Sequence, residues 1–265
     1  MSGSWIQVAQ EALKLPGLIV EIYGDVAKPG VRQVGKALDT VLGLGNTILW
    51  PIALANERSR IYLERNLEAY RRRLEAVPEE KISEVPPEIG VPIAEKIAYV
   101  RDERLADLYV SLLAKASCID TIDQAHPSFV NVINNLSPDE AQLLEYFVPY
   151  NDLIFLTAKW IDPKTHLYSF AGELLLHPDQ LTGLMFPANI PAYLSNLSGL
   201  GLVSVHHDRF ISAEGQHADY DRVEAYWRAT LPAANAELPG RTLQIERGVV
   251  CCTGFGRQFI RACHQ

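Results

Sequence analysis

The sequence lacks the usual signs of a secreted or zinc-binding chain. Its four cysteines lie at Cys118, Cys251, Cys252 and Cys263. They include no CxxC pair and are too few for a disulfide scaffold, so we interpret them as free thiols. The N-terminal residues have neither a basic lead nor a continuous apolar stretch, which argues against a secretory signal. We therefore expect a cytoplasmic protein.

Positive charge is also scarce. Lys and Arg number 24 against 32 Asp and Glu, which gives a formal net charge of -8. Because non-specific nucleic-acid affinity comes mainly from Lys and Arg, this balance argues against a surface that binds phosphate backbones all over. A local basic patch remains open. There is no glycine-rich phosphate loop either, whereas 48% apolar residues in a chain of 265 are typical of a globular protein with one or two cores.

No apolar run is long enough to cross a bilayer. The longest uncharged stretch before the chain's centre is Thr40 to Ala55 (TVLGLGNTILWPIALA), which is shorter than the roughly 20 residues that a spanning helix needs. It ends a two-faced helix predicted from Pro29. An interfacial or pore-forming helix is one interpretation, and a buried helix of a bundle is the one we favour.

One face of that predicted helix is a candidate contact surface for a membrane or a partner. Its apolar residues recur at helical spacing. They are Val31, Val34, Leu38, Val41, Leu42, Ile48 and Leu49.

The next helix is predicted to start after Asn56 and to pair with another helix. Leu63, Leu67, Tyr70 and Leu74 repeat at steps of four and three, which fits a partner in the same chain or in a second copy. The basic run 71–73 lies among glutamates at i,i+4 spacing, so we interpret it as a solvated face. The charged, proline-bounded segment 78–87 is typical of a linker.

Three short helices in series are predicted in the central segment. Asp102 can cap the first, whose apolar stripe extends to Ala116. The turn His126, Pro127, Ser128 precedes the second, which begins at Phe129. The third starts at the sequence Ser-Pro-Asp-Glu at 137–140, which suits a capping box.

At these residues the sequence resembles a known family. The runs EIGVPIAEKIAYV at 88–100, LLAKAS at 112–117, HPSF at 126–129 and LSPDEA at 136–141 are similar to the abortive-infection alpha family of bacteria, also catalogued as a domain of unknown function. The resemblance extends to VGKALDTVLGLGNTIL at 34–49. It implies a bacterial protein associated with phage exclusion and leaves the mechanism open.

The C-terminal part is predicted to resemble a winged helix. A strand is expected at 153–160, then a helix from 189 that stops at Gly199 and Gly201, then a strand to 205. The second wing strand is either 209–212 or 243–252, with a further helix inserted at 219–230. The helix before the wing has no basic residue, so we favour a packing or protein-contact module over a DNA reader.

Residues that suggest chemistry all have structural explanations. His126 lies near Asp120 and Asp123 and is a candidate general acid or base, but no nucleophile accompanies it locally, so a histidine that braces the turn is favoured. His206 and His207 are adjacent in a predicted strand and point to opposite faces, which disfavours a shared metal ion. The adjacent thiols at 251 and 252 would strain a vicinal disulfide, which leaves one exposed and one buried thiol.

The sequence therefore predicts a mainly α protein with a small β component, in which an N-terminal helical region precedes a winged-helix-like domain. The predicted divisions are 1–86 with amphipathic helices and a linker, 87–136 as a central helical segment, and 137–265 as the winged-helix-like domain. The predicted function is non-enzymatic anti-phage defence through protein contact, self-association or peripheral contact with the inner membrane. A winged-helix DNA-binding regulator is the alternative. No catalytic, cofactor or metal site is predicted.

Overall fold

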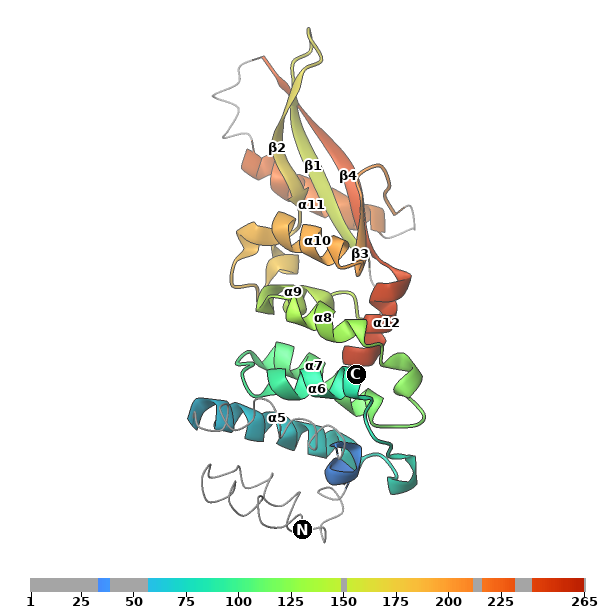
Figure 1. The fold of residues 1–265 in the computed structure, drawn as a ribbon. Helices are drawn as coiled ribbons and strands as arrows, with labels where there is room; N and C mark the ends of the chain where they lie inside the picture. Colours follow the sequence, from blue (N-terminus) through green and yellow to red (C-terminus); the bar gives the residue numbers. More distant parts are fainter. Residues whose placement is uncertain (1–32, 39–56, 149–151, 212–215, 232–239, 265) are drawn as a thin grey trace, which may run out of the picture. The chain divides into compact units, whose positions relative to one another are not determined.

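The computed structural model describes residues 33–38, 57–148, 152–211, 216–231 and 240–264 (Figure 1). They are mainly helical with a smaller β component, as predicted. The chain divides into two compact units. Unit 1 comprises Met1–Pro138 and Gln258–Gln265, and unit 2 comprises Asp139–Arg257. The predicted boundaries after residues 86 and 136 stay predictions.

Unit 1 is built from helices. They are a helical segment at 33–38, α5 (Glu57–Glu75), α6 (Pro87–Ile97), α7 (Glu103–Ala116), α8 (Ser128–Asn134) and the last part of α12 (Gly254–Cys263). The predicted stripe of α5 is buried, with Leu63 and Leu74 fully inaccessible. The sequence left open whether the stripe packs on the same chain or on a second copy. Because α5 packs on α6 and α7, it packs on helices of the same chain.

Polar groups inside unit 1 find specific partners. The amide of Asn66, buried in α5, donates to the carbonyl of Ile97 at 2.7 Å, so it satisfies a group at the end of α6. The Tyr70 hydroxyl bonds to Ser117, and burial raises the pKa of this tyrosine. On the outside of α5, Arg71 pairs with Glu68 and Glu75, as the spacing predicted.

The predicted linker at 78–87 is an ordered part of unit 1. Ile82 and Val85 are buried, and Ile82 forms an isolated β-bridge with Cys118. The backbone N–H of Ser83 donates to Ser117 at 2.9 Å, and that of Val85 donates to Ala37 at 2.9 Å. The two buried apolar side chains and these backbone hydrogen bonds together hold the segment on the core, and the linker interpretation was wrong in this respect.

Unit 2 holds a four-stranded antiparallel sheet in the order β2-β1-β4-β3. Its strands are β1 (Leu153–Ile161), β2 (Tyr168–Leu175), β3 (Val203–His206) and β4 (Thr242–Cys252), and its helices are α9 (Pro138–Glu145), α10 (Ile190–Gly199) and α11 (Gln216–Thr230). The partner of β3 is β4, the later of the two strands that the sequence offered. A winged helix is not confirmed, because its wing is a two-stranded hairpin and β3–β4 is instead one side of a larger sheet.

The sheet of unit 2 is covered on one face by α11. Ile154 and Leu156 of β1 pack against Tyr220 and Val223 of α11 in a buried cluster. Close packing also explains a glycine in β4, because a Cβ at Gly248 would lie 2.2 Å from the Phe155 ring. In Figure 1, α10 lies across the end of the sheet at which β3 pairs with β4.

The predicted start of the last helix is confirmed. The hydroxyl of Thr253 accepts a hydrogen bond from the Gly256 N–H at 2.8 Å, which caps α12. The same hydroxyl lies 2.6 Å from the Gly201 carbonyl. A Cβ at Gly256 would lie 2.0 Å from the carbonyl oxygen of Leu202, so only glycine allows this approach.

Candidate functional site

Two residues of the predicted apolar contact face, Val34 and Leu38, lie among the described residues. Both are buried in unit 1, with exposed fractions of 0% and 2%. Beside them, Gln33 donates to the Val77 carbonyl at 2.9 Å. The other five residues of that face lie outside the described part of the chain. No helix within the described ranges is long and apolar enough to span a membrane.

The turn before α8 uses its histidine as a brace. His126 Nδ1 lies 2.6 Å from the Ser128 hydroxyl and accepts a hydrogen bond from the Ser128 N–H at 3.1 Å. The Phe129 ring is buried and meets the Phe259 ring edge-on at 5.4 Å. These contacts fix the first turn of α8, as the structural interpretation of His126 predicted.

The adjacent histidines and thiols contact different neighbours. His206 lies 3.1 Å from the Ser204 hydroxyl, whereas the His207 ring meets the Phe155 ring edge-on. All four cysteines are free thiols. The sequence predicted one buried and one exposed thiol at 251 and 252. Cys252 is the buried one, but Cys251 is half-buried rather than exposed. Burial, together with the nearby Asp152 carboxylate, raises the pKa of the Cys251 thiol to about 11.

Asp139, at the start of α9, organises a distant loop of unit 2. Its carboxylate is only 4% exposed. One oxygen accepts the N–H of Met185 at 2.8 Å, and the other accepts the N–H of Phe186 at 2.8 Å and the hydroxyl of Tyr193 at 2.8 Å. A buried carboxylate requires such donors, and the positive end of the α9 dipole favours its charge.

A second carboxylate ties α10 to α9. Glu140, 5% exposed, accepts a hydrogen bond from the Asn196 amide at 2.8 Å. Tyr193 and Asn196 are one turn apart on α10, so the two neighbouring acids hold the same helix at two points. Burial and the hydrogen bond to Asp139 raise the pKa of Tyr193.

The loop that Asp139 holds presents two large apolar side chains to solvent. Met185 is 71% exposed and Phe186 is 57% exposed. They lie in a stretch from 180 to 205 that contains no Asp, Glu, Lys or Arg, in a chain where 21% of residues are charged. The exposed positions of this stretch form a continuous piece of loop and the outer side of α10.

We name these exposed positions the uncharged surface. They are Thr182, Gly183, Met185, Phe186, Pro187, Ala188, Asn189, Pro191, Ala192, Ser195, Ser198 and Gly199.

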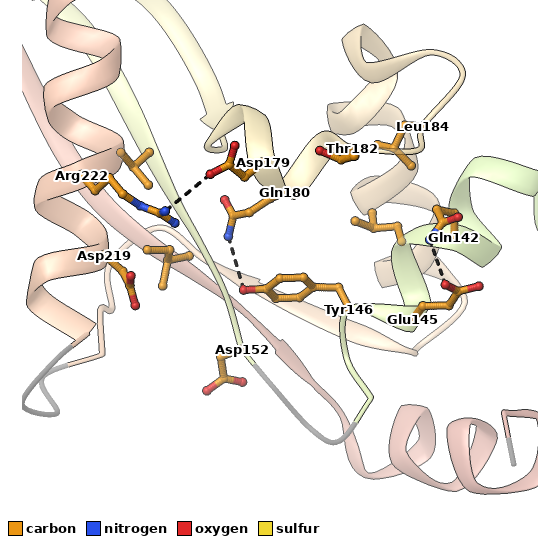
Figure 2. A pocket seen from close by; sticks show the side chains of 13 residues that line it. Gln142, Glu145, Tyr146, Asp152, Asp179, Gln180, Thr182, Leu184, Asp219 and Arg222 are labelled. Carbon is orange, nitrogen blue, oxygen red and sulfur yellow. Dashed lines mark hydrogen bonds and ion pairs between the residues drawn. The ribbon is translucent and has the colours of Figure 1, made fainter.

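A cavity of about 880 Å³ lies beside this loop, within unit 2 (Figure 2). Its walls come from α9, the start of β1, the 3₁₀ helix η3 (Pro178–Leu181) with the loop after it, and α11. Figure 2 shows the Gln180 amide directed at the Tyr146 hydroxyl, 3.4 Å away, and Arg222 directed at Asp179. Thr182 and Leu184 connect the cavity to the uncharged surface.

The cavity carries more negative than positive charge. Four carboxylates line it, from Glu145, Asp152, Asp179 and Asp219, against the single guanidinium of Arg222. Such a lining attracts a cationic group. No set of three or more His, Cys, Asp or Glu within the described ranges is arranged to hold a metal ion.

Reasoning from the sequence found Asp139 only as a helix start. Its partners lie 46, 47 and 54 residues further along, so spacing could not reveal them. The signal that was present is the uncharged run from 180 to 205, which contains the adjacent residues Met185 and Phe186. Loop-forming residues place a stretch at the surface rather than in the core. When such a stretch is also poor in charge, it is typical of a contact surface.

The comparisons with known proteins place the chain in a family. No curated protein matches it. One solved structure, that of an uncharacterized protein from the hydrocarbon-degrading marine bacterium Alcanivorax borkumensis SK2, is similar at 23% identity over 52% of this chain and 92% of the other, with a TM-score of 0.31. The family model for abortive infection alpha matches residues 62–263. The chain therefore belongs to the abortive infection alpha family.

Proposed function

We propose that this protein is a non-enzymatic, cytoplasmic defence protein of the abortive-infection type that acts by binding a protein through unit 2. The family membership supports a role in phage defence. The observation that carries the binding role is the uncharged surface, with Met185 and Phe186 held outward by the buried Asp139.

The hydrogen bonds of Asp139 support a contact surface held in one shape. Large apolar side chains are unfavourable in water. The exposed parts of Met185 and Phe186 therefore add no hydrophobic stabilisation to the fold. A buried carboxylate that bonds both of their N–H groups fixes the loop in advance, which lowers the entropy lost on binding. Protein interfaces are also depleted in charge and enriched in Met and Phe at their centre.

The charge pattern disfavours the other partners that the sequence allowed. Membrane-surface helices usually present Lys and Arg to anionic lipids, and nucleic-acid readers present them to phosphates. The uncharged surface offers neither type of residue. The winged-helix DNA regulator thus has no support from α10, whose outer positions are Pro, Ala, Ser and Gly.

A phage challenge tests this function. A bacterial host that expresses the protein should form fewer plaques or survive differently from a host without it. Phe186→Asp should abolish the effect, since it replaces a large exposed apolar side chain of the surface with a charge. Ile119→Asp is the matched control, because Ile119 lies in unit 1 and is 58% exposed. Circular dichroism should show that both variants fold.

Two results would overturn the proposal. One is a host whose response to phage is the same with and without the protein. The other is full protection by a folded Phe186→Asp variant. Two binding assays complete the test. Recovery of the protein in the lipid layer after flotation with liposomes would assign the surface to a membrane, and a salt-resistant complex in a DNA mobility-shift assay would assign it to DNA.

A further inference from the structure

We infer that the partner of the uncharged surface is a second copy of this chain, so that the protein forms a weak two-fold dimer through α10 and the loop before it. This inference rests on the proposed function, because it names the partner of the same surface. It follows from the charge, the shape and the size of that surface.

The charge of the chain restricts where two copies can meet. Each copy carries a formal charge of -8, so most of their surfaces repel one another at short range. In a two-fold contact the same patch lies on both sides, and any charge near the axis faces its own copy. Salt screens charges that are farther away than about 8 Å, so what matters is the charge of the contact itself. The twelve exposed residues of the uncharged surface include no Asp, Glu, Lys or Arg, and the carboxylates of Asp139 and Glu140 beneath it are buried and hydrogen-bonded within the same copy.

A different protein would be expected to leave another signature. Contacts between unlike proteins usually add opposite charges around the apolar centre of the interface, because these steer the encounter and reject wrong partners. A chain with an excess of carboxylates would use them for a basic partner. The stretch 180–205 instead contains no charged residue at all, which is the composition that can face a copy of itself.

The outer side of α10 allows close approach of a second helix. Its exposed residues after Pro191 are Ala192, Ser195, Ser198 and Gly199, which are all small and lie one turn apart in pairs. Two copies of α10 can therefore cross with little separation between their backbones. Met185 and Phe186, which precede the helix, then supply the large apolar side chains that such an interface uses as anchors.

The size of the surface predicts a weak dimer. Stable interfaces use roughly 20 to 30 residues from each partner, whereas the uncharged surface has twelve exposed residues. We therefore expect a weak dimer, with a dissociation constant on the order of 10 μM. The protein should thus be monomeric when dilute and dimeric when concentrated.

Gly199 provides a variant that separates the dimer from the fold. A Cβ at this position would meet no atom within 4 Å, so a longer side chain fits the single copy. Gly199→Glu should stabilise the helix, because Glu has a higher helix propensity than Gly. Its negative charge near the C-terminus of α10 should destabilise the helix by a comparable amount, because it lies at the negative end of the helix dipole. In the dimer it introduces two like charges beside the axis. Gly254, the first residue of α12, is equally open and lies outside the surface, so Gly254→Glu is the matched control.

Sedimentation velocity and equilibrium over concentrations from about 1 μM to about 300 μM test the inference. The weight-average mass of the full chain and of Gly254→Glu should rise from 29.5 kDa toward twice that value. Gly199→Glu and Phe186→Asp should weaken dimerisation at least about tenfold, which corresponds to about 1.4 kcal/mol. Added NaCl should leave the dimer unchanged or strengthen it, because the contact is uncharged and the copies repel elsewhere.

Each outcome decides the inference. A wild-type mass that stays at 29.5 kDa at every concentration would refute it, as would a dimer that Gly199→Glu leaves intact. If the protein is monomeric while Phe186→Asp still loses phage protection, the inference fails and the proposed function stands with a different protein partner. If the dimer forms as described but no variant changes the response to phage, the inference stands and the proposed function fails.

Discussion

Helix α7 of unit 1 and helix α10 of unit 2 both bury one apolar side, and they differ in what lies on the other. The outer side of α7 carries Glu103, Arg104 and Asp107, and two of these pair with arginines of α5. The outer side of α10 carries no charge. Packing in the core explains the apolar residues on the inner side of both helices. The residues on the outer side do not pack in the core, so their difference points to a difference in function.

The inner sides of the two helices should respond alike to a cavity. Leu112 of α7 and Leu197 of α10 are both fully buried. Leu112→Ala and Leu197→Ala should each lower the free energy of unfolding by about 2 to 5 kcal/mol, because each loses buried methyl groups and leaves a void. Urea unfolding followed by circular dichroism measures this. A loss below about 1 kcal/mol at either position would show that its core is looser than the structure indicates.

Two aspartates should give unequal effects. Asp139→Ala removes the partner of two backbone N–H groups and one hydroxyl, and we expect a loss of about 2 to 4 kcal/mol. Asp107→Ala on α7 breaks only an exposed ion pair with Arg73 and should cost less than about 1 kcal/mol. Thermal melts of both variants make the comparison. Equal losses would remove the special role that we give to Asp139.

Buried tyrosines should make both units sensitive to alkali. Burial raises the pKa of Tyr70 in unit 1 and of Tyr193 in unit 2, while the unfolded chain keeps ordinary values near about 10. The stabilisation is therefore complete below about pH 10 and falls as the pH rises above it, by at most about 1.4 kcal/mol per pH unit for each group. Tyr70→Phe should reduce this fall, as measured by urea unfolding at pH 7 and pH 11. An unchanged slope in that variant would argue against the role of Tyr70.

The smallest effects on stability belong to the outer sides. Ser195→Glu on α10 and Arg104→Gln on α7 should each change the free energy of unfolding by no more than about 0.5 kcal/mol, because both side chains are exposed. Only the α10 variant should lose dimer formation and phage protection. If Arg104→Gln has the same consequences, the distinction between the two outer sides disappears.

Local signals in the sequence predicted much of the helical structure. Asp102 caps α7 and Thr253 caps α12 as expected, because a cap depends on residues within one turn. The apolar stripe of α5 was also predictable from its spacing. In these cases the interaction and its cause are close together in the chain.

Other parts depend on residues far apart and were missed. Strand β2 (Tyr168–Leu175) was not predicted, because it has exposed Tyr168 and Phe170 and no buried run of its own, and it exists by pairing with β1. The segment 78–87 contains only Ile82 and Val85 as buried residues, so its charges dominated the pattern. The site around Asp139 is the extreme case, since its donors come from a loop and a helix some fifty residues away.

The central claim is that the uncharged surface of unit 2 works by contact, and one pair of variants tests it most directly. Gly199→Glu and Gly254→Glu add the same side chain at two open glycines, inside and outside that surface. Plaque counts on hosts that express equal amounts of each folded variant give the measurement. Our account predicts that Gly199→Glu loses protection and that Gly254→Glu keeps it, whereas equal protection by both variants would contradict it.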